Sequence, residues 1–171
     1  FEKALLCAKA RGVAVAPRVL EALVNAFAAH HHASCLDALA TAAEACFSFS
    51  NAPDSTHDST HDGGVSAAAV GASTRTHENE RLCALFCPAF GSCVESAAAC
   101  LSAHPIADKA EVARALFECA HKIATFAPFV FLNATHGRTQ GDQPTLACHT
   151  ALSVAVAALS TRERDATRAA T

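Results

Sequence analysis

Methionine, tryptophan and tyrosine are absent from this 171-residue sequence, and glycine and proline are scarce, with 7 and 6 residues. So little glycine and proline excludes a collagen-like chain and a Pro/Gly-rich disordered chain. All ten aromatic residues are phenylalanine, which gives little support to stacking of aromatic side chains on nucleic-acid bases. Because the sequence has no methionine and begins at Phe1, we expect it to be a processed or partial segment of a longer chain.

Charge is also sparse. Charged residues make up 17% of the chain, below the usual quarter, and the formal net charge is −3. This balance argues against a general polyanion-binding protein. The negative charge is concentrated in residues 47–80, and the rest of the chain is close to neutral. That neutrality neither supports nor excludes contact with RNA.

Alanine is the most abundant residue, at about a quarter of the chain. Alanine has the highest helix propensity, and residues that favour strands are few, so the composition predicts an all-α protein. We expect Pro17 to open one helix, which ends at the run His30–His32, and Ser34 to cap the next. Pro88 is expected to end a helix. The expected helices cover 1–10, 17–29, 35–47, 80–87, 92–103, 108–126, 128–132 and 144–159. In two of them the apolar spacing defines one face, formed by Val112, Leu116, Cys119, Ala120 and Ile123 in 108–126 and by Leu152, Val156 and Leu159 in 144–159.

The sequence divides into three parts. Residues 48–79 are rich in Ser, Thr, Asp, Asn and Gly and contain a tandem DSTHDSTHD at 54–62, which is typical of a solvated insertion or a disordered loop. On either side, residues 1–47 and 80–171 are predicted to form helical hairpins. The histidines of the tandem, His57 and His61, alternate with aspartate, and a solvated loop explains them better than a metal site does.

Internal repetition suggests how the hairpins are arranged. An Ala-Leu step recurs at Leu23, Leu85, Leu116 and Leu152, with intervals of 62, 31 and 36 residues. A period of this size corresponds to one helical hairpin per repeat, and such hairpins stack because one alone cannot bury both of its faces. The spacing therefore predicts stacked antiparallel hairpins, a short α-solenoid, with the polar insertion inside the first interval. An irregular helical bundle is the alternative.

Three segments carry a resemblance to a known family. Residues 2–13 look like the end of one repeat, and residues 17–26 (PRVLEALVNA) and 144–153 (PTLACHTALS) look like the starts of others. In these features the chain resembles the pentatricopeptide repeat family and its organellar relatives. The resemblance implies binding of single-stranded RNA in mitochondria or chloroplasts, with a base-reading residue two positions before the repeated leucine. Those positions hold Glu21, Cys83, Arg114 and Thr150, and only Thr150 suits base reading.

From this resemblance we expect a non-catalytic helical-repeat subunit of a mitochondrial ribonucleoprotein assembly, such as the mitochondrial ribosome. Its partners would be other protein subunits, with single-stranded or ribosomal RNA contacted at a few positions. The alternative is a protein-only α-helical scaffold without an RNA role. The candidate RNA-binding residues are Arg18, Arg114, Thr150, Arg162, Arg164 and Arg168.

Catalytic, metal and membrane roles have weaker support. The sequence lacks a Gly-rich phosphate loop, GxSxG and HExxH, so no enzyme activity and no cofactor are expected. Cys83, Cys87, Cys93 and His104 are candidate zinc ligands, but no C-x2-C pair is present. Reduced thiols that pack as small apolar residues explain the nine cysteines better. Residues 143–161 are uncharged, yet they contain Pro144 and His149, which favours a buried helix over a membrane span.

Overall fold

The protein is all-α, as the composition predicts. The computed structural model describes residues 12–48, 67–136 and 145–169, with side chains described for 17–48, 77, 79–106, 108–135 and 145–160. The helix predicted over 1–10 lies outside these ranges. Within them six α-helices pack together with one 3-10 turn and one short pair of strands. In chain order these are α2 (Gly12–His30), α3 (Ala33–Phe47), α4 (Ala67–Ala103), η2 (Ile106–Lys109), α5 (Ala110–Phe126), α6 (Pro128–Asn133), β1 (Thr135–His136), β2 (Thr145–Leu146) and α7 (Ala147–Ala169).

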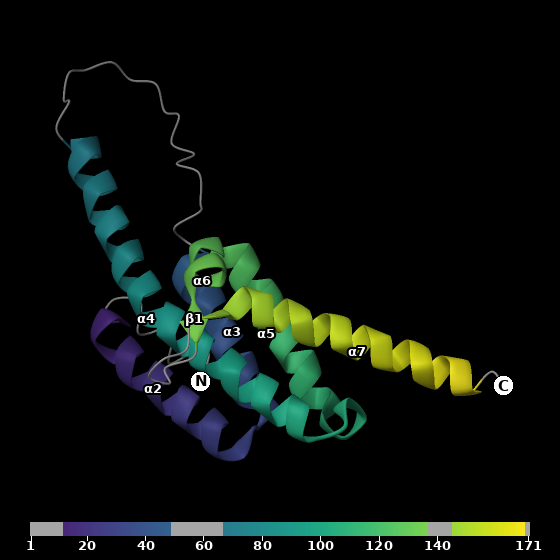
Figure 1. Cartoon of the computed structure of the whole chain (residues 1–171). Coiled ribbons are helices and arrows are strands. Elements are labelled where there is room, and N and C mark those ends of the chain that lie inside the picture. Colours follow the sequence, from purple (N-terminus) through teal and green to yellow (C-terminus); the bar gives the residue numbers. More distant parts are fainter. Residues whose placement is uncertain (1–11, 49–66, 137–144, 170–171) are drawn as a thin grey trace.

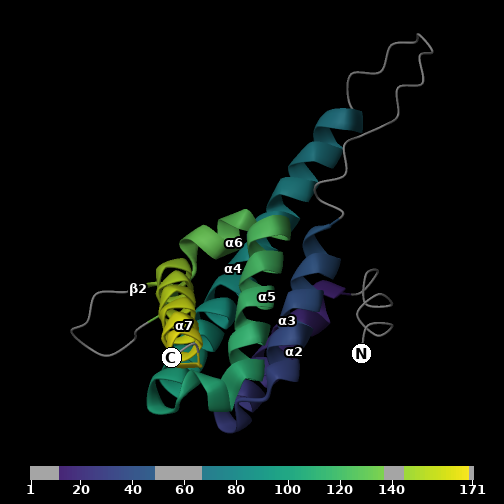
Figure 2. The ribbon, with the colours of Figure 1, turned by 90° about the vertical axis from the view of Figure 1, so that its right-hand side faces the viewer.

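Helix α4 runs through the middle of the molecule, and the other helices pack around it (Figures 1 and 2). Helix α2 packs along α4, and α3 packs most extensively on α5. Helix α7 packs against α4 near its own start, and its C-terminal part extends beyond the other helices (Figure 1). The first part of α4 also extends away from the body, at the opposite side of the molecule.

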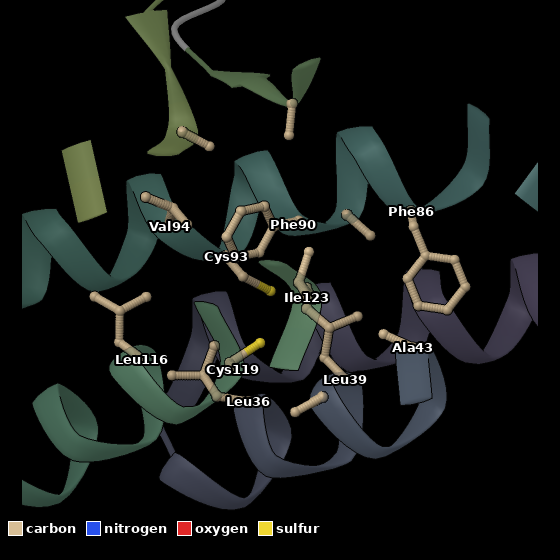
Figure 3. Packing of buried hydrophobic residues seen from close by; sticks show 14 of the residues in the cluster. Leu36, Leu39, Ala43, Phe86, Phe90, Cys93, Val94, Leu116, Cys119 and Ile123 are labelled. Atoms are coloured by element: carbon tan, nitrogen blue, oxygen red, sulfur yellow. The ribbon is translucent and has the colours of Figure 1, made fainter. Parts of the chain in front are cut away.

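Leucine, phenylalanine and cysteine side chains from α3, α4 and α5 form the centre of the core (Figure 3). Phe90, Leu36, Leu116, Cys119 and Ile123 are all fully buried. The rings of Phe47 and Phe86 pack edge to face at 5.4 Å between centroids, which joins the end of α3 to α4. No polar or charged residue is buried among the side chains that the structure describes. Apolar burial therefore holds these three helices together.

The histidine run closes the α2–α3 turn, as the sequence predicts, but with a different cap. His31 has a φ of 48°, in the left-handed region that side chains other than glycine rarely adopt. Its Nε2 lies 3.2 Å from the Ser96 hydroxyl of α4, and its ring packs edge-on to Phe27. His32, rather than Ser34, is the N-cap of α3, because its Nδ1 lies 2.7 Å from the Ser34 hydroxyl and accepts from the Ser34 amide.

Two prolines do not act as predicted. Helix α2 begins at Gly12 and contains Pro17, and α4 runs through Pro88 without ending there. A proline removes one backbone hydrogen bond, and a helix held by tertiary packing tolerates that loss. The Pro88 ring is exposed, and buried residues such as Phe86 and Phe90 hold α4 in the core on both sides of it. The two helices predicted at 80–87 and 92–103 are therefore one.

The insertion predicted at residues 48–79 ends earlier in the chain than expected. Helix α4 begins at Ala67, so residues 67–79 are helical and not part of a loop. The alanines at 67–69 are strong helix formers, and the helix extends back from the buried part of α4. The repeat, DSTHDSTHD, lies outside the described residues. The final helix begins at Ala147 instead of Pro144, and part of the predicted connection, 133–143, forms strand β1, which pairs with β2 in an antiparallel register.

The repeated leucines are not structurally equivalent. Leu116 is completely buried, Leu23 and Leu85 are half-buried, and Leu152 is 60% exposed. Side chains at matching positions of stacked repeats have matching environments, so the Ala-Leu steps do not mark a common core position. The all-α prediction is confirmed, whereas stacked hairpins stay a prediction.

Candidate functional site

Helix α7 has two apolar faces of different size. Its inner face consists mainly of small residues, with Ala147 and Ala151 buried against the body and Val154 partly buried. A helix turns by about 100° per residue, so Leu152, Val156 and Leu159 lie on a different side of the helix, about 80–180° around its axis from these alanines. We call Leu152, Val156 and Leu159 the outer stripe. The two leucines and Val156 therefore point away from the core, whereas Val154 packs partly against it.

The outer stripe is strongly exposed. The relative exposure is 60% for Leu152, 63% for Val156 and 66% for Leu159. Single exposed leucines are common on protein surfaces, but a row of three on one helix face is a feature of interaction sites. Turning α7 about its axis would exchange alanines for leucines in the core, and the fold does not adopt that arrangement. The outer stripe is the best candidate for a functional surface on this molecule.

More exposed apolar residues lie on the elements just before α7. Phe129 and Leu132 on α6 are 60% and 59% exposed, and Leu146 on β2 is 44% exposed. Helix α6 contacts both α5 and α7. Together with the outer stripe, these are all the large exposed hydrophobic residues among the described side chains. The apolar surface is thus confined to residues 129–159.

No charge interrupts this surface on α7. Residues 145–160 contain no Asp, Glu, Lys or Arg. Two of the exposed hydroxyls turn back onto the helix, since Ser153 Oγ donates to the His149 carbonyl at 2.9 Å and Ser160 Oγ donates to the Val156 carbonyl at 3.0 Å. The outer stripe can therefore bind an apolar partner surface, and it offers nothing to a phosphate group.

Backbone contacts fix the start of α7. The Ala147 amide donates to the Ala134 carbonyl at 2.8 Å, next to the β1–β2 pair. Strand β1 in turn packs directly on α4 at Gly91. A Cβ at position 91 would overlap the carbonyl oxygen of Thr135 and lie 3.1 Å from its carbon. The absent side chain of Gly91 thus permits the close approach that positions β1, β2 and the first turn of α7.

The three predicted RNA-binding residues whose side chains are described lie on three different helices. Arg18 is exposed on α2, Arg114 is exposed on α5, and Thr150 is half-buried in the first turn of α7. The guanidinium of Arg114 lies 2.7 Å from the Glu118 carboxylate. The hydrogen bond that Arg114 donates to Glu118, together with the charge of Glu118, raises the pKa of Arg114, and the charges of Asp37 and Glu111 add to the effect. Side chains of Arg162, Arg164 and Arg168, on the last turns of α7, lie outside the described set.

The charges of the described surface also disfavour the binding of anions. Lys122 pairs with Glu44 at 2.6 Å, which joins α5 to α3. Acidic side chains outnumber basic ones, eight to five, over the side chains described in 17–48, 77, 79–106, 108–135 and 145–160. The acids are Glu21, Asp37, Glu44, Glu80, Glu95, Asp108, Glu111 and Glu118, and the bases are Arg18, Arg81, Lys109, Arg114 and Lys122.

A second apolar feature is a groove beside α4. It has a volume of about 500 Å³ and lies between α4, the ends of α3 and α5, and the start of α6. Cys83 and Cys87 line it from one face of α4, together with Phe47 and Phe126. Burial raises the pKa of both thiols, and the charge of Cys83 adds to the rise at Cys87. Raised values keep these thiols protonated and weakly nucleophilic at neutral pH.

The residues weighed as zinc ligands do not come together. Cys93 is buried in the core and points toward Cys119 (Figure 3), while His104 is exposed beyond the end of α4. Burial raises the pKa of Cys93 to about 12 and also raises the pKa of Cys119. In the part of the chain that the structure describes, no three His, Cys, Asp or Glu side chains are grouped in a way that holds a metal ion.

One helix has the length and apolar composition to cross a membrane. It is the Asn79–Ala103 part of α4, and not the 143–161 segment that the sequence analysis considered. This stretch is also the central helix of the fold, and about half of its most apolar window is buried by the protein itself. Core helices of soluble proteins pass the same test of length and composition, so this property is weak support for a membrane role.

Comparison with known proteins adds no relative: no protein-family model, curated protein or solved structure matches the chain. The surface of the molecule is therefore the basis for assigning its function.

The sequence revealed the spacing of Leu152, Val156 and Leu159, but the helix that carries them was predicted to be buried. The signal that was missed is the second apolar face of the same helix, formed by Ala147, Ala151 and Ala158. A helix without charge on any side does not reveal which face it buries.

Proposed function

We propose that this protein is a non-catalytic α-helical interaction module that binds another polypeptide through the outer stripe of α7. The observation that supports the proposal is the inverted burial of α7, which covers its alanines and exposes its leucines. Covering a leucine or valine that is exposed in the free protein is worth about 1.5–3 kcal/mol. Three such residues in one row supply enough apolar area to favour a bound partner over water.

The chemistry of the surface selects the class of partner. An uncharged, apolar helix face is complementary to another apolar helix or to an apolar groove of a protein. Phosphate recognition requires basic side chains or helix N-termini, and Arg114, one of the two described arginine candidates, is paired with the Glu118 carboxylate. A protein partner therefore fits the stripe better than RNA does.

The narrower prediction from sequence is compatible with this role. A subunit of a mitochondrial ribonucleoprotein, such as the mitochondrial ribosome, buries apolar helix faces on neighbouring proteins. In a stacked-hairpin protein, moreover, the last helix presents a free face to the next unit. RNA contact in such an assembly would rest on Arg18 and on the basic end of α7, with Arg162, Arg164 and Arg168. We keep this organellar role as a proposal within the broader one.

The test is affinity purification of the tagged, endogenous full-length protein, compared with a Leu152→Glu/Leu159→Glu variant. Mass spectrometry and RNA sequencing are applied to the same eluates. The stripe variant should lose the proteins that co-purify with the natural chain, because two buried charges oppose an apolar contact. Ala157→Glu is the control, since it adds a charge at an exposed position of α7 that lies about 100° or more around the helix from each residue of the stripe. Partners that both variants retain equally would refute the proposal.

The same eluates test the ribonucleoprotein role. Ribosomal RNA and ribosomal proteins recovered together would support an assembly subunit, and ultraviolet crosslinking would then report direct RNA contact. Direct contacts to phosphate weaken steeply with salt, because binding releases counterions. A set of proteins that resists nuclease and contains no RNA would leave the interaction module and remove the RNA role.

A further inference from the structure

The distribution of exposed apolar residues limits how two copies of this chain can meet. All six large exposed hydrophobic residues lie between Phe129 and Leu159, on α6, β2 and α7. The described side chains of α2, α3, α4 and α5 include no large hydrophobic residue that is exposed. Over the described side chains, a head-to-tail contact between copies would place the outer stripe either against a polar surface or against the groove beside α4. The same face of a second copy is the counterpart that exposes large apolar side chains of its own.

We propose that the outer stripe binds the outer stripe of a second copy, so that two α7 helices pack antiparallel about a twofold axis. This inference rests on the proposed interaction role and names the partner. A contact that uses the same patch on both molecules is isologous and closes at a dimer. Leu152 and Val156 are four residues apart, and Val156 and Leu159 are three apart. This alternation of four and three is the spacing of the core residues where two helices pack side by side.

Charge and shape both permit this pairing. The described part of α7 carries no charged residue, so two copies meet without like-charge repulsion. Small residues such as Ser153 and Ala155 flank the stripe, which allows helix axes to approach to about 8–10 Å. The C-terminal part of α7 extends beyond the other helices, so that part of the helix is accessible from outside the body (Figure 1).

The available area sets the expected strength. The six exposed side chains leave roughly 600 Å² of apolar surface per copy, if a large side chain has about 150–250 Å² in total. A pair would cover about 1,200 Å², which is the lower end of stable, specific interfaces. The outer stripe alone provides only about half of this. We therefore expect a dimer with a dissociation constant of the order of micromolar, in which α6 contributes to the contact.

Sedimentation velocity of the full chain, from roughly 1 to 100 μM and with reductant present, measures the association directly. The natural chain should shift from monomer to dimer within this range. Leu152→Glu should weaken the dimer by roughly 100-fold or more, since each dimer carries the charge twice. Ala157→Glu, at an exposed position on another side of α7, should leave the association unchanged. Far-UV circular dichroism that is the same for all three chains would show that the variants fold.

A photo-crosslinking amino acid at Val156 identifies the contact. The antiparallel pairing predicts crosslinked dimers in which position 156 is joined to α7 of the other copy. A natural chain that stays monomeric at 100 μM overturns the inference, as does a dimer that Leu152→Glu does not weaken. A crosslink from Val156 to its own chain, for example to residues 1–11, also overturns it. Loss of other protein partners in the stripe variant, with a monomeric natural chain, would leave the proposed function intact and remove only this inference.

Discussion

Helices α5 and α7 have similar compositions but opposite relations to the core. Both contain the same Ala-Leu step, at Leu116 in α5 and at Leu152 in α7. Leu116 is completely buried, while Leu152 is 60% exposed. Ile123 of α5 is likewise buried and Leu159 of α7 is exposed, while Val154 of α7 is partly buried. One sequence pattern thus occurs once in the core and once on the surface.

The difference lies in the rest of each helix. The outward face of α5 carries Glu111, Arg114 and Glu118, which are costly to bury, so only one orientation of this helix is possible. Apart from the outer stripe, the described part of α7 is uncharged and mostly alanine, serine and threonine, and these small residues can be buried or exposed at little cost. Apolar spacing therefore shows that a helix has an apolar face, but charge on the opposite face decides that the apolar face is buried inside the molecule.

The matched substitutions Leu116→Ala and Leu152→Ala test this comparison most directly. Leu116→Ala should lower the free energy of unfolding by about 3 kcal/mol, because it removes buried methyl groups and leaves a cavity. Leu152→Ala should change it by less than about 0.5 kcal/mol in the monomer. Urea denaturation at low protein concentration measures both values. Equal losses for the two variants would mean that α7 also buries Leu152 in the free chain, and would remove the basis for the interaction surface.

Alkaline pH tests the burial of the inner face of α5. Burial raises the pKa of Cys93 to about 12, with a smaller contribution from Cys35, and burial with the charge of Cys93 raises the pKa of Cys119. The unfolded chain releases these protons near pH 9, while the folded chain retains them. Stability should therefore fall as pH rises from about 9 toward 12, by about 1.4 kcal/mol for each thiol at pH 10.

The absence of tyrosine simplifies the interpretation of this titration. The groups that titrate at alkaline pH are then the thiols, the lysines and the α-amino group, which limits competing titrations. Urea denaturation at pH 7 and pH 10, with reductant, gives the change in the free energy of unfolding. Cys119→Ala should be less stable at pH 7 and should lose less stability between the two pH values. A pH dependence that is the same in this variant would contradict burial of the Cys119 thiol.

Gly91→Ala tests the attachment of α7 to the body. The new methyl group would overlap the Thr135 carbonyl, so β1 would have to move away from α4. We expect a net loss of about 1–2 kcal/mol, since overpacking costs about 1–3 kcal/mol and the better helix propensity of alanine offsets part of it. Hydrogen exchange should show faster exchange for the Ala147 amide than in the natural chain. Ser92→Ala, at the exposed neighbouring position, is the control and should have little effect.

Much of the fold could be predicted from local signals. The apolar spacing of α5 placed Val112, Leu116, Cys119 and Ile123 on one buried face, and all four are buried. The end of α2 at the histidine run was also predicted. The prolines were misjudged because the cost of Pro17 and Pro88 depends on what holds the helix on either side. That support comes from residues far away in the sequence, as does the place of β1 at Gly91.

The candidate site could be predicted only in part. The spacing of Leu152, Val156 and Leu159 was recognised, but its exposure depends on how α7 lies against α4. The RNA-binding prediction for Arg114 came from its position in a repeat, and the repeat did not define a shared environment. Its carboxylate neighbours include Asp37, which lies on another helix and was not visible from the sequence around Arg114. Contacts between helices thus determine both the exposure of the outer stripe and the charges around Arg114.

Arg114→Gln is expected to have the smallest effect and completes the comparison from the polar side of α5. The Arg114 and Glu118 side chains are each more than half exposed, at 55% and 54%, and exposed pairs of this kind are worth at most about 0.5 kcal/mol. The variant should unfold within about 0.5 kcal/mol of the natural chain in urea, and the difference should shrink further in high salt. Co-purified proteins should also be unchanged, because the solvated charges of α5 keep its polar face in water, while the uncharged part of α7, residues 147–160, is free to bind. A loss of RNA in Arg114→Gln, with Glu118→Gln unaffected, would instead assign this face of α5 to RNA binding and make it a second functional surface.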